Sequence, residues 1–162
     1  MTAVSHLSLV RPPVVTIRAA KPRDLPQLKG MIAELAAHHG DVAQLTPEQL
    51  ERDLFGPHPW VNGLVAESGE DLIGFAILVP LYRAQEGARG MDLHQLFVRP
   101  EHRGHGIGQH LVTRARDLAR QAGCGYLSVS AATGNFAAHR FYEHMDFKAR
   151  PVTGMRYMQA IS

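Results

Sequence analysis

A glycine-rich segment, residues 103–108 (RGHGIG), lies between two stretches of strongly periodic sequence. Residues 91–98 (MDLHQLFV) before it are typical of a strand, whereas apolar side chains recur at helical spacing in residues 107–122 after it. Glycine loses more backbone freedom on folding than any other residue, so this cluster indicates special backbone conformations or the close approach of another group. The order of strand, glycine segment and helix is therefore the strongest constraint on the fold.

Periodic segments also fill the rest of the chain. The pattern predicts further helices at 24–39, 47–55 and 135–145, and further strands at 14–20, 60–68, 71–82, 125–131 and 151–160. The second of these helices should begin with a capping box formed by Thr46 and Gln49. We expect an α/β (α+β) fold with helices packed on a mixed sheet, a flexible N-terminal arm over 1–13 and a single domain over 14–162.

Composition and charge argue against several classes of protein. The chain of 162 residues has a net charge of +2 and scattered arginines, which does not indicate a nucleic-acid partner. No apolar stretch approaches the roughly 20 residues that cross a membrane, so we expect a cytoplasmic protein. Ten histidines are present without an H-E-x-x-H pattern, so we expect no metal site. A single cysteine, Cys124, cannot form an intrachain disulfide.

The glycine segment has the features of a phosphate-binding loop. The start of a helix carries unpaired N–H groups and a partial positive charge, and glycines let an anion reach the backbone. A P-loop is excluded because no lysine follows the glycines, and a dinucleotide fingerprint is excluded because Gln109 stands at its third glycine position. The spacing R-x-x-G-x-G remains. The alternative is a turn that needs glycine for chain geometry alone.

Residues 96–112 (LFVRPEHRGHGIGQHLV) and 135–147 (NFAAHRFYEHMDF) together resemble the GNAT superfamily of acyl-CoA-dependent N-acetyltransferases. The resemblance implies a GNAT fold, with a mixed sheet of about six to seven strands, a splayed central strand pair and helices on both faces. It also implies acetyl-CoA as co-substrate. The cradle for its pyrophosphate would be formed by Arg103, Gly104, His105, Gly106, Ile107, Gly108 and Gln109.

The same resemblance implies roles for two further groups of residues. The main chain of Leu96, Phe97 and Val98 would pair with the pantetheine arm and thioester. Asn135 would contact the cofactor, and Tyr142 would protonate the departing thiolate. These two residues are seven apart and so lie on nearly the same face of one helix. The alternatives are a helix cap for Asn135 and a core aromatic residue for Tyr142.

A finer resemblance, carried by residues 45–67, is to the diamine branch that includes spermidine/spermine and thialysine acetyltransferases. That branch shows Tyr-Leu-Glu-Asp where this chain has residues 92–95 (DLHQ), so its carboxylate is replaced by His94. An acidic residue and a tyrosine after the first helix are replaced by His38 and His39. Neutral or protonated imidazoles attract a polycation less than carboxylates do. A monoamine, an amino-acid-like amine or an acceptor with its own carboxylate therefore fits this chain better than a polyamine.

His94 is a candidate catalytic base. A free alkyl amine with a pKa near 10.4 is mostly protonated at neutral pH, so a base is needed to remove a proton before the nitrogen can act as a nucleophile. Strict alternation predicts that Asp92, His94, Leu96 and Val98 face one side of the strand and Leu93, Gln95 and Phe97 the other. Asp92 would then flank His94, and Asp92, His38 and His39 are candidates for binding the acceptor. The alternative is a half-buried structural histidine.

The sequence thus predicts an N-acetyltransferase that transfers an acetyl group directly from acetyl-CoA to a primary amine of a small molecule. Two alternatives stay open: an enzyme that acetylates a protein or peptide, and a non-catalytic acyl-CoA sensor. The resemblance to the diamine branch also implies a homodimer.

Overall fold

The structure, a computed structural model, describes residues 13–161. The chain forms two compact units that divide between Ser130 and Ala131, and each unit is described separately below. The expected arm over 1–13 lies, apart from Pro13, outside the described residues, and a single domain over 14–162 stays a prediction. Within residues 13–161, no helix combines the length and the apolar character that a membrane crossing requires.

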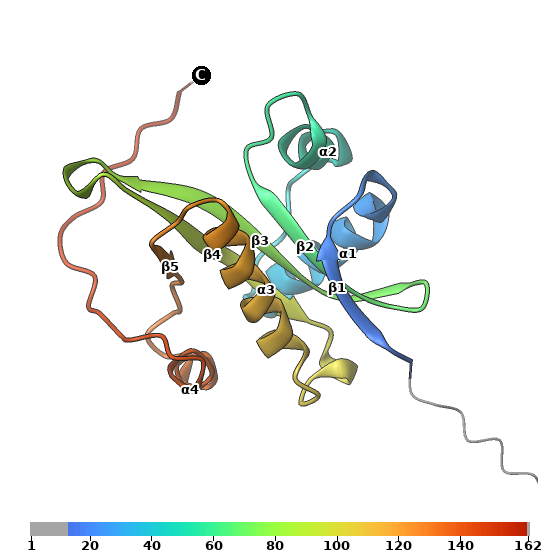
Figure 1. Ribbon diagram of the computed structural model, residues 1–162. Coiled ribbons are helices and arrows are strands. Elements are labelled where there is room, and N and C mark those ends of the chain that lie inside the picture. The colour runs from blue at the N-terminus through green and yellow to red at the C-terminus, as the bar shows by residue number, and fades with distance from the viewer. Residues whose placement is uncertain (1–12, 162) are drawn as a thin grey trace, which may run out of the picture. The chain divides into compact units, whose positions relative to one another are not determined.

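The first unit contains one sheet and three α-helices, which Figure 1 shows. The elements are β1 (Val15–Ala19), α1 (Leu25–His38), α2 (Pro47–Phe55), β2 (Asn62–Ser68), β3 (Asp71–Arg83), β4 (Ala88–Val98), α3 (Ile107–Gln121) and β5 (Tyr126–Ser128). The strands lie in the order β1-β2-β3-β4-β5; the first three pairings are antiparallel and the β4–β5 pairing is parallel. The predicted mixed α/β fold is confirmed.

Helices cover both faces of this sheet, as expected. Phe75 and Ile77 of β3 belong to a buried cluster that includes Leu28 and Met31 of α1 and Leu54 of α2. Gly74, the neighbour of Phe75, points to the opposite face, where a Cβ would lie 3.4 Å from Leu111 of α3. Burial of both faces explains why β3 has a continuous apolar run instead of an alternating one.

The second unit contains α4 (Phe136–His144), and residues 131–161 form no strand. The strand predicted over 151–160 is therefore wrong. A strand needs a neighbour to receive its N–H and C=O groups, and in this segment the large apolar side chains are exposed while Gly154 has a φ of 103°. The sheet consequently has five strands instead of the predicted six to seven.

Local sequence signals explain the start of α2. The Thr46 hydroxyl accepts from the Gln49 N–H at 3.2 Å, and the Thr46 N–H donates to the Gln49 side-chain oxygen at 2.9 Å. The predicted capping box is confirmed.

A partly buried ion-pair network joins β1 to β2 and to the single turn Pro22–Asp24. The Arg18 guanidinium donates two bonds to Asp24, at 2.7 and 2.8 Å, and two to Glu67, at 2.9 and 3.0 Å. Asp24 is only 4% exposed and also accepts from the Lys21 N–H at 2.7 Å. The bonds from Arg18 lower the pKa of the Asp24 carboxyl.

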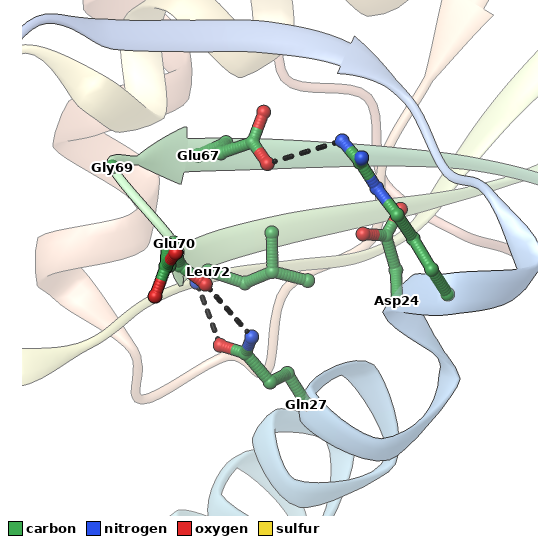
Figure 2. A pocket seen from close by; sticks show the side chains of 7 residues that line it. Asp24, Gln27, Glu67, Gly69, Glu70 and Leu72 are labelled. Atoms are coloured by element: carbon green, nitrogen blue, oxygen red, sulfur yellow. Dashed lines mark hydrogen bonds and ion pairs between the residues drawn. The ribbon is translucent and has the colours of Figure 1, made fainter.

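Two residues of this network, Asp24 and Glu67, also line an open pocket of about 400 Å³ at the β2–β3 turn. Figure 2 shows Gln27 of α1 beside this turn, where its side chain donates to the Glu70 carbonyl and accepts from the Leu72 N–H, at 3.0 and 2.8 Å. The polar groups of Gln27 thus fasten α1 to the hairpin.

Replacing Asp24 with Asn should lower the free energy of unfolding at pH 7 by about 2 kcal/mol, because hydrogen bonds to charged groups contribute roughly 1.5–3 kcal/mol. Since folding lowers the pKa of this carboxyl, its stabilisation is complete above the unfolded value of about 3.9 and disappears as the pH falls through the folded value. Urea unfolding of wild type and variant should therefore converge in acid. Asp53, a partly exposed carboxylate that pairs with the exposed Arg52, is the control when changed to Asn, and an equal loss in both variants would contradict the network's role.

Candidate active site

Strands β4 and β5 form a fork. Their parallel pairing covers three residue pairs and ends at Asp92 and Ser128, whereas β4 continues to Val98. The predicted strand over 125–131 is correspondingly shorter, since β5 ends where the two strands part. Beyond the fork, the edge of β4 that faces away from β3 has no strand beside it among the described residues of this unit. Alternate main-chain groups there are open to an extended ligand.

The base of the fork is built from Gly90, Tyr126 and Arg83. Gly90 is paired with Tyr126, and a Cβ at position 90 would overlap the tyrosine ring. The Arg83 guanidinium lies over the same ring, 4.3 Å from its centroid. Glycine is therefore needed at position 90 to let the Tyr126 ring cross β4.

Strand β4 contains a β-bulge at the fork. Ile77 of β3 is opposite Gln95, and the next residue, Leu78, is opposite Leu93, so His94 is an extra residue on β4. Bulges disturb the ladder and re-aim side chains. The bulge accordingly places His94 with 61% of its side chain exposed.

The strict alternation predicted for β4 is wrong because of this bulge. Asp92 is opposite Val79 and Leu96 is opposite Ala76, and these two positions on the regular strand β3 face opposite sides of the sheet. Asp92 thus shares a face with Phe97, whose ring contacts Phe75 at a centroid distance of 5.9 Å, and lies on the opposite face from Leu96.

Asp92 nevertheless lies close to His94, as predicted. Its Oδ2 atom is 3.9 Å from Nδ1 of His94, while its Oδ1 atom accepts a hydrogen bond from the Ser128 hydroxyl at 2.7 Å. Sequence analysis missed Ser128. The alternating segment around it predicted a strand, but only the β4–β5 register shows which residue it meets.

The backbone conformation of the loop explains why residues 104 and 106 are glycines. Gly104 and Gly106 have φ values of 80° and 79°, and a Cβ on either would meet no atom within 4 Å. Glycine is therefore required at both positions by the left-handed backbone conformation. Crowding by other atoms of the protein is not the reason. Gly106 is also the N-cap of α3, and no side chain of the cap accepts a hydrogen bond from the first N–H groups of the helix.

Other residues of the predicted cradle fix the loop. Nε of Arg103 donates to the Val98 carbonyl at 2.9 Å, which ties the loop to the end of β4. His105 Nδ1 lies 3.2 Å from the His102 carbonyl. Ile107 is buried and Gln109 is exposed. Since the Ile107 side chain is in the core, only its main chain can contact a ligand.

The structure does not connect His38 and His39 with the fork. They lie at the end of α1, both exposed, with ring centroids 5.6 Å apart. In the described part of the chain, no hydrogen bond or ion pair links either ring to Asp92 or His94. Their role in acceptor binding stays a prediction.

The second unit carries Asn135 and Tyr142, both on α4. Asn135 is the N-cap, and its side-chain oxygen accepts from the Ala138 N–H at 3.2 Å. The Tyr142 ring lies between Phe141 and Phe147, at centroid distances of 5.3 and 5.6 Å. Burial raises the pKa of Tyr142, so its phenol stays protonated to a higher pH than that of an exposed tyrosine.

Comparisons with known proteins give one consistent family. A profile of the acetyltransferase (GNAT) family matches residues 29–147. Thialysine N-epsilon-acetyltransferases from Sus scrofa and Bos taurus are each 30% identical over 139 residues, which covers 80% of this chain and 81% of theirs. A spermidine/spermine N(1)-acetyltransferase-like protein from Homo sapiens is 30% identical over 135 residues, 78% of this chain but 19% of that protein.

Solved structures agree at the level of the fold. The ribosomal-protein-alanine N-acetyltransferase of Brucella melitensis biovar Abortus 2308 matches with a TM-score of 0.73 and 21% identity, over 90% of this chain and 100% of the other. An aminoglycoside acetyltransferase from an uncultured soil metagenomic sample matches with a TM-score of 0.76 and 19% identity, over 90% and 96% of the two chains.

Replacing Gly90 with Ala should destabilise the protein by about 1–3 kcal/mol, because the added methyl group must displace the Tyr126 ring. Gly125, changed to Ala, is the matched control, since a Cβ there meets nothing within 4 Å. Urea unfolding measures both. Equal stability of the two variants would contradict the packing described for the base of the fork.

Proposed function

Because this chain belongs to the acetyltransferase (GNAT) family and is an acyltransferase, we propose that it transfers an acetyl group from acetyl-CoA to a primary amine of a small molecule. The observation that carries this proposal is the fork of β4 and β5. After the two strands separate at Asp92, β4 continues to Val98 and leads into the glycine loop that contains Gly104 and Gly106. Both features belong to the first unit and follow each other along the chain.

The residues of this unit fit acetyl-CoA. Its diphosphate needs N–H donors in a space free of side chains, and Gly104, Gly106 and the uncapped start of α3 provide them. Its pantetheine arm can form amide hydrogen bonds, and the main chain of residues 96–98 lies along the open edge of β4. The side chain of Arg103 contributes by holding the loop against the end of that strand.

Acetyl-CoA supplies an activated thioester, and the residues of this chain handle the protons. His94 takes a proton from the acceptor's ammonium group and passes it to solvent, which frees the nitrogen lone pair to form the new carbon–nitrogen bond. Tyr142 gives its phenolic proton to the sulfur as the carbon–sulfur bond breaks. The tyrosine is then reprotonated through water by the second proton that the nitrogen releases.

We propose an amino-acid-like amine as the acceptor class. The relatives in Sus scrofa and Bos taurus are named for the epsilon nitrogen of thialysine. His94, in place of the carboxylate of the diamine branch, removes a negative charge that would favour a polycation. An acceptor screen that compares amino-acid-like amines, polyamines and peptides tests this class. We also propose a cytoplasmic homodimer, which sedimentation and cell fractionation would test.

Replacing Gly106 with Ala should weaken coenzyme A binding about 5–30-fold, because a left-handed conformation costs an L-residue roughly 1–2 kcal/mol and moves the N–H donors. Gly123, changed to Ala, is the matched control, since it has a similar φ of 75° after the other end of α3. Calorimetry should find normal affinity in the control. Unchanged affinity in the Gly106 variant would exclude the cradle.

Replacing Tyr142 with Phe should lower kcat about 100-fold and leave coenzyme A affinity unchanged, since a positioned general acid contributes roughly 10²–10⁴-fold. Because burial raises the pKa of Tyr142, the wild-type phenol should stay protonated beyond its ordinary value near 10, so kcat should show no loss from this group below that pH. The exposed Tyr82, changed to Phe, is the control. An unchanged kcat would remove Tyr142 from the reaction.

A further inference from the structure

Three polar side chains meet at the point where β4 and β5 separate. Asp92 and Ser128 form the last residue pair of the parallel ladder, and the Ser128 hydroxyl donates to Oδ1 of Asp92 at 2.7 Å. The other carboxylate oxygen of Asp92 lies 3.9 Å from Nδ1 of His94. One carboxylate therefore connects a residue of β5 with the bulge residue of β4.

The three side chains differ in how freely they can move. Asp92 sits within the paired part of β4, and 25% of its side chain is exposed. Ser128 fixes one of its oxygens and so sets the direction of the other. His94 is the most exposed of the three, and its ring has rotational freedom unless a partner holds it. At 3.9 Å, Nδ1 of His94 and Oδ2 of Asp92 are too far apart for a hydrogen bond, so the exposed ring would have to turn toward the carboxylate to form one.

We propose that Ser128, Asp92 and His94 act as one chain, in which Ser128 and Asp92 are positioning residues for the His94 base. This inference rests on the function proposed above. Ser128 holds Asp92, and the carboxylate accepts Nδ1–H of His94, which selects one imidazole tautomer and leaves the Nε2 lone pair free. The acceptor's ammonium proton then moves to Nε2. The Asp92 side chain then stabilises the imidazolium until its proton leaves to water.

The arrangement also assigns Asp92 a use other than acceptor binding. Its two oxygens are directed to Ser128 and to His94, both within the protein. A carboxylate in such a bridge stabilises the positive charge that develops on the neighbouring imidazole during the reaction. The negative charge at the fork thus serves the base, and recognition of the amine's remaining groups falls to other residues.

The first test reads the His94 ring directly, in protein without any ligand. Long-range proton–nitrogen NMR at about pH 8.5, above the ordinary histidine pKa of about 6.5, distinguishes the two neutral tautomers. Wild type should show the Nδ1–H form at His94. Asp92→Asn should shift it to the Nε2–H form and Ser128→Ala to a mixture, whereas Ser130→Ala, an exposed serine two residues further on, should match wild type. An unchanged tautomer in Asp92→Asn overturns the proposal.

The second test measures transfer with saturating acetyl-CoA. Asp92→Asn should lower kcat roughly 10–100-fold, in line with loss of an oriented base, and Ser128→Ala by a smaller factor. The KM for acetyl-CoA should stay within about twofold in both, since neither residue belongs to the glycine loop. Circular dichroism identifies a variant that fails to fold, and Ser128→Ala, which removes one oxygen, then carries the test.

The two proposals fail in different ways. If wild type shows the Nδ1–H tautomer but transfers acetyl to no amine, the chain of three residues holds and the enzymatic function does not. If wild type is active and both variants keep its kcat and its tautomer, the function holds and the chain of three residues is overturned.

Discussion

The separation of β4 from β5 is the constraint on which the candidate site depends. Parallel pairing ends at Asp92 and Ser128 although β4 continues for six more residues, to Val98. Main-chain groups on that edge would be costly to leave unpaired in a buried position, so the fork is either solvated or occupied by a ligand. A strand edge that opens next to a helix start offers two kinds of backbone donor to one extended molecule. The candidate base His94 lies at the point where this edge opens.

Two departures from regular structure determine the geometry of the candidate site. The bulge at His94 shifts the alternation of β4, so Asp92 and Leu96, which a regular strand would put on one face, lie on opposite faces. The left-handed residues Gly104 and Gly106 then turn the chain into α3, whose first N–H groups have no side-chain cap from Gly106. Both irregular segments cost conformational free energy, which the regular packing on either side of the sheet offsets. The buried cores against α1 and α3 therefore hold the site's irregular backbone in place.

Much of this could be predicted from sequence because the signals are local. The capping box at Thr46, the stripe of α3 and the glycine loop all depend on residues a few positions apart. The predictions that were wrong concern the pairing of strands that are far apart in the sequence. Residues 151–160 have the composition of a strand but no partner strand, and the strict alternation through His94 ignored a shift that only the opposing β3 defines. Ser128 was missed for the same reason, since its meeting with Asp92 joins positions 36 residues apart.

The position of the carboxylate gives the departure from the diamine branch a physical meaning. Where that branch shows Tyr-Leu-Glu-Asp, this chain has Asp92 in place of the tyrosine and His94 in place of the glutamate. Replacing the glutamate alone would leave an exposed imidazole without orientation. Asp92 places one carboxylate oxygen 3.9 Å from that imidazole, and the Ser128 hydroxyl across the fork donates to the other oxygen. The aspartate at 92 and the histidine at 94 thus act as a pair in the proposed arrangement, in which a base of different chemistry would occupy the bulge.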